Sequence, residues 1–85
     1  MVRLTQKQRD VFQRIVSYNN LHKFYPSAAK LAVIFSISRD SVRDRIKALE
    51  KKGYLVNEDG IYKPTLDGLE QYMKDSGTNR IKKGR

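Results

Sequence analysis

The sequence predicts a mainly α-helical domain that carries one small β-hairpin. Three observations lead to this fold class. Apolar residues recur at helical spacing in four segments, a serine or threonine precedes each segment, and two short β-prone runs flank a turn-rich tetrad between the third segment and the fourth. The predicted order of elements is therefore α-α-α-β-β-α.

Length and composition limit what such a domain can do. The 85 residues have room for one small domain, and the absence of cysteine excludes disulfides, thiol catalysis and thiolate metal sites. The 18 Lys and Arg outnumber the 9 Asp and Glu, and a net charge of +9 favours a polyanion as partner. The longest apolar run, residues 31–35, is far shorter than the ~20 residues of a membrane span. We expect a cytoplasmic, nucleoid-associated protein.

The first two helices are predicted from their caps and apolar faces. Thr5 precedes a helix at residues 6–21, in which Val11, Phe12 and Ile15 share one face. Asn19 and Asn20 and the stretch at residues 23–26 break the helical pattern, and Ser27 then caps a second helix at residues 28–35.

The third helix is the most informative segment, since it combines a narrow apolar stripe with a crowded basic face. Ser38 caps it, Gly53 stops it, and Val42, Ile46 and Leu49 keep an apolar register at intervals of four and three residues. About three residues separate it from the second helix, which is the arrangement of a helix-turn-helix.

A hairpin and a short helix complete the domain. Residues 54–56 and 61–63 are β-prone and flank the tetrad 57–60, while Pro64 ends the second strand and Thr65 caps a fourth helix at residues 66–74. The whole is the order of a winged helix-turn-helix. We predict a winged-helix DNA-binding domain at residues 1–75 and a basic disordered tail at residues 76–85.

The exposed face of the third helix is predicted to enter the major groove of duplex DNA, where Arg43 would donate to a guanine and Asp40 or Asp44 would accept from a cytosine amine. Lys47 and its cationic neighbours suit phosphates, and Lys52 joins them in this role. The second helix would lie along the backbone, and Lys63 is the favoured wing contact. The candidate DNA-binding residues are Ser27, Lys30, Arg39, Asp40, Ser41, Arg43, Asp44, Arg45, Lys47, Lys51 and Lys63.

Other interpretations remain open from the residues alone. A mixed-charge helical face is often merely solvated, and Asp40, Asp44 and the acidic hairpin tip favour a protein-contact module of a replication or transcription assembly. A non-specific nucleic-acid coat protein is a further alternative. Stacking of single-stranded bases on aromatic side chains is disfavoured, because the spacing of the aromatic residues is that of side chains that pack in the core or hold a loop in place. These residues are Tyr18, Phe24, Tyr25 and Phe35.

We expect that the protein is not an enzyme and that it binds no cofactor, metal or small-molecule ligand. The sequence has no cysteine, no pair of histidines and no phosphate-binding glycine loop, and His22 lacks a second metal ligand at a useful spacing. The apolar stripe of the fourth helix either closes the core or makes a homodimer contact, and dimerisation on DNA is the other route to a dimer. That stripe consists of Leu66, Leu69, Tyr72 and Met73.

Several short motifs resemble a known family. Residues 4–15 (LTQKQRDVFQRI) are similar to the first helix of the LexA-repressor DNA-binding domain, and residues 25–27 to its following loop. Residues 38–42 and 49–55 also resemble winged-helix regulators of the GntR and MarR types. The resemblance implies a winged helix that binds duplex DNA as a small transcriptional regulator, most simply a repressor.

The sequence also departs from this family. Ser36 stands at the turn position that usually holds glycine, and Lys30 replaces an acidic residue. We expect no Ser/Lys self-cleavage domain and no ligand-binding domain after the DNA-binding portion, and we expect regulation to come from elsewhere.

Overall fold

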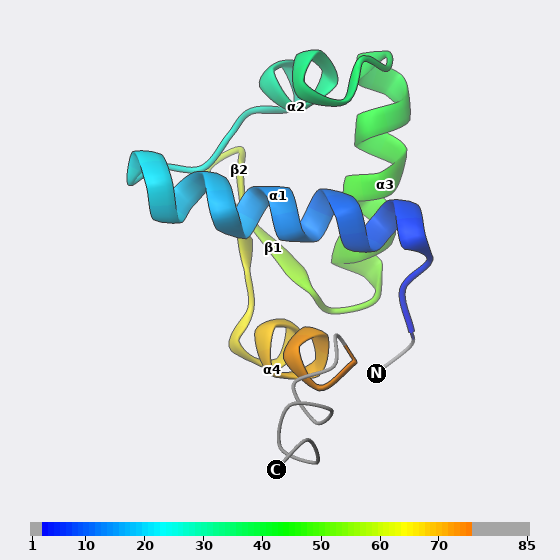
Figure 1. Ribbon diagram of the computed structural model, residues 1–85, viewed down its shortest axis with the longest axis vertical. Coiled ribbons are helices and arrows are strands. Elements are labelled where there is room, and N and C mark those ends of the chain that lie inside the picture. Colours follow the sequence, from blue (N-terminus) through cyan, green and yellow to red (C-terminus); the bar gives the residue numbers. More distant parts are fainter. Residues whose placement is uncertain (1–2, 76–85) are drawn as a thin grey trace, which may run out of the picture.

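Between residues 3 and 75, four helices and one two-stranded hairpin follow one another in the computed structural model, in the predicted order (Figure 1). The structure describes residues 3–75, so the predicted basic tail lies outside the described residues. The prediction of a mainly α winged helix is confirmed. The helices are α1 (Gln6–His22), α2 (Ala28–Phe35), α3 (Arg39–Lys51) and α4 (Leu66–Asp75), and the antiparallel strands are β1 (Leu55–Glu58) and β2 (Ile61–Pro64).

The predicted caps begin the first three helices. The hydroxyl of Thr5 accepts the N–H of Gln8 at 3.2 Å, and the Gln8 side chain accepts the N–H of Thr5 at 3.1 Å, which completes a capping box. Ser27 and Ser38 each accept the N–H three residues further on, at 3.1 Å. Each cap satisfies a donor that the helix itself leaves unpaired.

Three helices end at a residue in the left-handed conformation, and at the end of α1 this residue is Lys23, with φ 71°. Ser36, directly after α2, has φ 58°, a value that glycine adopts without strain. At the end of α3, Gly53 has φ 89°, and the N–H of Tyr54 donates to the carbonyl of Leu49 at 2.9 Å, as in a Schellman motif. The predicted stop at Gly53 is therefore confirmed, and Ser36 occupies the glycine-type position.

The hairpin differs in detail from its prediction. β1 begins at Leu55, one residue later than predicted, because the N–H of Tyr54 is bonded to the end of α3. The strands extend further toward the tip, so the turn narrows to Asp59 and Gly60, whose φ values are 54° and 83°. Positive φ at both positions is what a type I′ turn requires. Pro64 belongs to β2, opposite Leu55, at the end of the ladder where a missing N–H is tolerated.

The core lies where α1, α2 and α3 meet the start of the hairpin. Phe12 and Tyr54 meet edge to face at its centre, with ring centroids 5.6 Å apart. The predicted apolar stripe of α3 is wholly buried. The buried apolar residues are Val11, Phe12, Ile15, Leu31, Ala32, Val42, Ile46, Leu49, Tyr54 and Leu55.

The apolar stripe of α4 divides between core and surface. Leu69 and Tyr72 pack against the core, and the Tyr72 ring lies 5.1 Å from that of Phe12. Leu66 and Met73 remain 81% and 56% exposed. Half of the stripe therefore closes the core, as predicted, and the other half faces solvent.

The aromatic residues are partly core anchors and partly surface. Tyr25 and Phe35 pack against the core, whereas Phe24 is 57% exposed. Its ring lies 5.5 Å from that of Tyr18, which in turn lies 4.2 Å from the ring of His22 at the end of α1.

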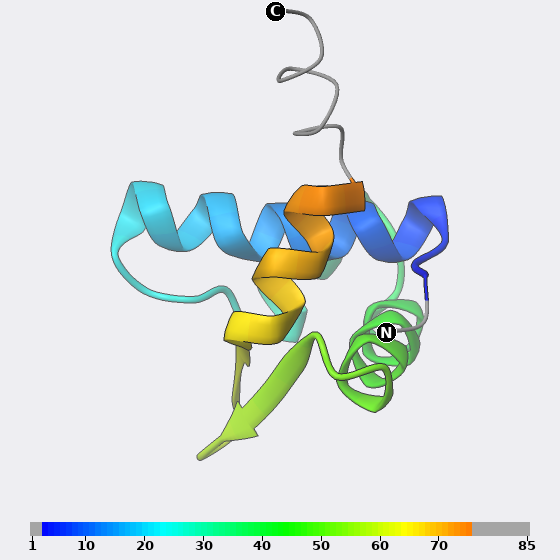
Figure 2. The same cartoon turned by 90° about the horizontal axis from the view of Figure 1, so that it is seen from below.

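The two views show how the elements are layered. α4 crosses α1 on one side of the molecule, while α3 and the projecting hairpin lie on the side away from α1 (Figure 2). This leaves α3 and the hairpin next to each other with an open outer face. No helix within residues 3–75 combines the length and apolarity needed to cross a membrane.

Candidate nucleic-acid interface

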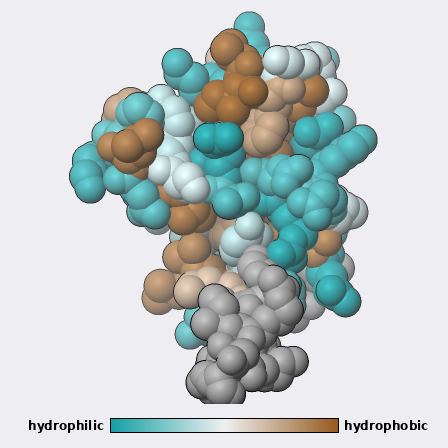
Figure 3. Space-filling model, in the orientation of Figure 1, coloured by the Kyte–Doolittle hydropathy of each residue, from teal (hydrophilic) through white to brown (hydrophobic). Residues whose placement is uncertain are grey.

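The outer face of α3 carries the charged residues that the sequence assigns to DNA. Arg43, Asp44 and Lys47 are exposed, and so are Arg39 and Asp40 at the start of the helix. Hydrophilic side chains accordingly cover the side of the molecule that α3 forms (Figure 3). A protruding, solvated helix of this kind has the dimensions that fit the major groove.

The charges on this face fall into two rows. Arg39, Arg43, Lys47 and Lys51 follow one another at intervals of four residues, and we call them the basic row. Asp40 and Asp44 form the adjacent row, also four residues apart. Because side chains at i and i+4 lie one above the other, each row presents a single sign of charge along the helix.

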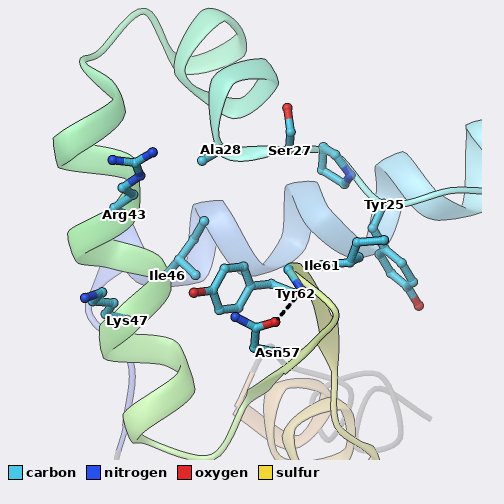
Figure 4. A pocket seen from close by; sticks show the side chains of 11 residues that line it. Tyr25, Ser27, Ala28, Arg43, Ile46, Lys47, Asn57, Ile61 and Tyr62 are labelled. Carbon is cyan, nitrogen blue, oxygen red and sulfur yellow. Dashed lines mark hydrogen bonds between the residues drawn. The ribbon is translucent and has the colours of Figure 1, made fainter.

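A hollow of about 550 Å³ lies beside the basic row. Arg43, Ile46 and Lys47 border it from α3, Ser27 from the start of α2, and Asn57 and Tyr62 from the hairpin (Figure 4). The Tyr62 hydroxyl points from the hairpin toward α3. Among the described residues that line the hollow, none is acidic.

The start of α2 faces the same hollow. The hydroxyl oxygen of Ser27 already accepts a hydrogen bond from the N–H of Lys30 within the same helix start. The two preceding N–H groups of the helix, those of Ala28 and Ala29, have no partner within residues 3–75, and Lys30 itself is exposed. The positive end of the helix dipole therefore adds to the field of the two α3 cations.

The wing cation is already paired. The Nζ of Lys63 lies 2.9 Å from the Oε1 of Glu58, and this hydrogen bond together with the charge of Glu58 raises the pKa of Lys63 above its ordinary value. Asp59 and Glu58 make the tip acidic. A phosphate that approaches Lys63 would therefore also meet the negative charge of Glu58.

Other predicted contacts lie apart from the basic row. Ser41 and Arg45 are half-buried on another edge of α3, and the Ser41 hydroxyl accepts a hydrogen bond from Ser38 at 3.0 Å. Lys52 reaches back to α1, where its Nζ donates to the Gln8 side chain at 2.7 Å and to the Arg3 carbonyl at 3.0 Å. Lys52 thus ties α3 to the N-terminal segment.

Asn57 is a lining residue that the sequence does not single out. In the sequence Asn57 is recognised only as a turn residue, and its side-chain oxygen indeed accepts the N–H of Gly60 at 2.8 Å. Its place opposite α3 depends on how the hairpin packs. No cluster of His, Asp or Glu within residues 3–75 has the makings of a metal site.

Comparisons with known proteins point to one family. The family model described as LexA DNA binding domain matches residues 1–64. The LexA repressor of Oleidesulfovibrio alaskensis is 35% identical over 57 residues. The match covers 67% of this chain and 28% of that protein, so the chain spans little more than a quarter of its relative's length.

Proposed function

The chain belongs to the LexA DNA-binding domain family, and from this membership we propose that it is a repressor-type transcriptional regulator that reads a sequence in duplex DNA. The family membership bears out the resemblance to the LexA-repressor DNA-binding domain that was drawn from the first helix and the following loop. The observation that best supports the proposal is the two-row charge pattern on the open face of α3, beside the wing.

In the proposed mode of binding, α3 lies in the major groove and the hairpin follows the adjacent backbone. Asp40 and Asp44 would accept from base amines, and Arg39 at the leading end would donate to a guanine. Each well-formed base contact would contribute about 1–3 kcal/mol of discrimination. The cations near the hollow would hold the protein in register on the phosphates.

The aspartates argue for a sequence reader over a non-specific coat. A carboxylate beside a phosphate is repelled, so Asp40 and Asp44 weaken binding wherever no base amine meets them. A protein that merely coats nucleic acid would gain nothing from two acids on its contact helix. We therefore expect strong discrimination between duplexes.

The proposal is tested with fluorescence anisotropy on random and genomic duplexes, in salt from about 50 to 200 mM. We expect a steep loss of affinity with salt, and a genomic fragment that stays bound above the random background. Arg43→Ala and Lys47→Ala should each weaken binding. Arg14→Ala removes one charge from the exposed outer side of α1 and serves as the matched control. Unchanged binding of both α3 variants would contradict the proposal.

A second candidate function is a protein-contact module, which the acidic tip and the exposed Val56 and Ile61 of the hairpin favour. Binding to a protein partner that is insensitive to salt, with no binding to any duplex, would establish it. Equal affinity for duplex, single strands and structured RNA would instead indicate a coat protein.

We also propose that two copies bind a palindromic site, with Leu66 and Met73 of α4 as the contact between them. These two side chains are seven residues apart, on one exposed face of the helix. Sedimentation with and without operator DNA distinguishes a preformed dimer from one that assembles on DNA. Leu66→Glu should weaken either dimer and leave the monomer folded. A repressor of this kind would act at the nucleoid.

A further inference from the structure

We propose that Asp59, at the tip of the hairpin, is a specificity-determining residue that selects G·C over A·T base pairs beside the segment bound by α3. The inference rests on the proposed duplex binding and deepens it, because it names the class of operator that the protein accepts. It concerns the tip of the wing, where the charge is opposite in sign to that of the chain as a whole.

The first observation is the charge of the hairpin. Residues 55–64 contain the acids Glu58 and Asp59 and one cation, Lys63, so their formal charge is −1 in a chain of +9. Glu58 is paired, since its Oε1 lies 2.9 Å from the Nζ of Lys63. Asp59 is exposed, and no hydrogen bond or ion pair within residues 3–75 holds its carboxylate. The outermost charge of the wing is therefore a solvated negative one.

The second observation is the place of this carboxylate. Asp59 and Gly60 have the positive φ values of a type I′ turn, and the N–H of Gly60 donates to the Asn57 side chain at 2.8 Å, which fixes the turn. The hairpin stands beside α3 and projects toward the same side of the molecule (Figure 2). A duplex whose major groove holds α3 has a minor groove on the far side of the adjacent backbone. The tip, and Asp59 with it, is the part of the hairpin that meets this groove.

The chemistry of the minor groove decides which base pairs a carboxylate tolerates there. A·T and T·A pairs present only acceptors, the N3 of adenine and the O2 of thymine, and these repel a carboxylate. A G·C pair adds the N2 amino group of guanine, which can donate a hydrogen bond to it. A-tracts also narrow the groove and make its potential more negative, which attracts cations and repels an anion. Both effects favour G·C pairs beneath the tip.

The position of the wing cation agrees with this role. Proteins that bind the minor groove regardless of its width place arginine or lysine in it. Here Lys63 lies opposite Val56, further from the turn, and is paired with Glu58. The turn itself carries the acid. The tip therefore discriminates between grooves more than it adds affinity.

The test selects operators from a random library with the wild type, Asp59→Asn and Glu70→Gln. Both variants remove one negative charge, and Glu70 is exposed on α4, away from α3 and the hairpin, so Glu70→Gln is the matched control. Asparagine is favoured in a type I′ turn, so Asp59→Asn keeps the fold, which a thermal melt checks.

We expect the wild type and Glu70→Gln to enrich G·C pairs beside the segment bound by α3, and Asp59→Asn to lose this enrichment. On an operator with A·T pairs at those flanking positions, Asp59→Asn should bind about fivefold more tightly than the wild type, the effect of removing one like charge about 4 Å away in water.

Inosine separates a contact in the minor groove from a contact of α3. It lacks the N2 amino group of guanine and keeps the acceptors of the major-groove edge, so α3 meets an unchanged surface. Inosine in place of guanine, at each flanking position in turn, should weaken the wild type about fivefold at one position, the lower end of what a single base pair contributes. It should leave the affinity of Asp59→Asn unchanged there.

The results keep the two proposals apart. If the wild type and Asp59→Asn select the same flanking bases, or if inosine affects both proteins alike, the role of Asp59 is overturned and duplex binding stands. If the wild type binds no duplex even at low salt, the proposed function itself fails.

Discussion

The side-chain hydroxyl of Thr65 donates a hydrogen bond to the main-chain carbonyl of Gly53 at 2.7 Å, across the base of the hairpin. The same oxygen accepts the N–H of Gly68 at 2.8 Å and so caps α4, as the sequence predicts. The N–H of Thr65 donates to the Tyr54 carbonyl at 2.9 Å. One threonine therefore joins the end of α3, the two ends of the wing and the start of α4.

Thr65→Val keeps the shape of the side chain and removes all of its hydroxyl bonds. It leaves the Gly68 N–H and the Gly53 carbonyl without this partner, so we expect a loss of about 2 kcal/mol in the free energy of unfolding. Urea denaturation measures this loss. Thr65→Ser keeps the hydroxyl and is the control. Equal stability of the valine and serine variants would show that the hydroxyl bonds contribute nothing.

Gly68 in α4 lies directly against the backbone of Tyr54. A Cβ built at this glycine would lie 2.7 Å from the Tyr54 Cα and 2.8 Å from the Tyr54 carbonyl oxygen. Gly68→Ala should therefore destabilise the protein by about 1–3 kcal/mol, although alanine favours a helix. Glu70→Ala, at an exposed position of the same helix, should change stability little. A thermal melt in which Gly68→Ala gains stability would contradict the close approach.

Ser36 holds the left-handed turn between α2 and α3, at φ 58°. Glycine adopts this conformation without strain, so Ser36→Gly should stabilise the protein by about 0.5 kcal/mol, the relief of strain exceeding the greater freedom of the unfolded chain. A β-branched residue fits it poorly, and Ser36→Val should cost about 1–2 kcal/mol. Chemical denaturation of the three proteins gives this ranking. A valine variant as stable as the glycine variant would refute it.

Lys51 and Lys52 are neighbours in sequence with different surroundings. Lys52 bonds to Gln8 and to the Arg3 carbonyl, whereas Lys51 is exposed on the basic row. Lys52→Met should lower the free energy of unfolding by about 1 kcal/mol and leave duplex affinity nearly unchanged. Lys51→Met should weaken duplex binding and leave the free energy of unfolding nearly unchanged. Thermal melting measures the stability of each variant, and fluorescence anisotropy measures its affinity for duplex DNA. Equal loss of affinity in both variants would contradict the prediction.

Alkaline pH should destabilise the fold through Tyr54. Burial, reinforced by the charge of Asp75 and opposed by that of Arg9, raises the pKa of the Tyr54 phenol above its ordinary value of 10.0. The folded protein then holds this proton more tightly than the unfolded chain does. The resulting stability is fully present below pH 10.0 and is lost as the pH rises through the folded-state pKa.

Urea midpoints at about pH 9 and about pH 11 measure this effect. The wild type should lose more stability between the two values than Tyr54→Phe, which has no phenol to ionise. All other side chains are the same in the two proteins, so their contributions cancel in the comparison. Equal losses would show that Tyr54 does not contribute.

The helices of this protein are readable in its sequence because their signals are local. Thr5, Ser27 and Ser38 each bond within three residues, and the apolar stripe of α3 repeats at the period of the helix that buries it. The element order and the family resemblance depend on such short-range patterns. The sequence predicts the hairpin less accurately, because the N–H of Tyr54 bonds to the end of α3 and β1 starts one residue later than its β-prone run.

The role of individual cations was beyond the reach of sequence. The sequence makes Lys63 the favoured wing contact and Lys52 a candidate for phosphate, and the structure adds that Lys63 pairs with Glu58 and that Lys52 lies 2.7 Å from the Gln8 side chain of α1. Both partners lie on other strands or helices. Which charges are available to a polyanion therefore depends on packing.

Local patterns in the sequence are enough to predict the helices, the order of the elements, the buried faces of the first three helices and the positive net charge, since propensity, capping and periodicity act over a few residues. Tertiary packing is needed to bring Arg43 and Lys47 of α3 to one hollow with Asn57 and Tyr62 of the hairpin. That juxtaposition is set by how the burial of Phe12, Tyr54 and their neighbours orients the elements, and such long-range packing leaves no local pattern in the chain.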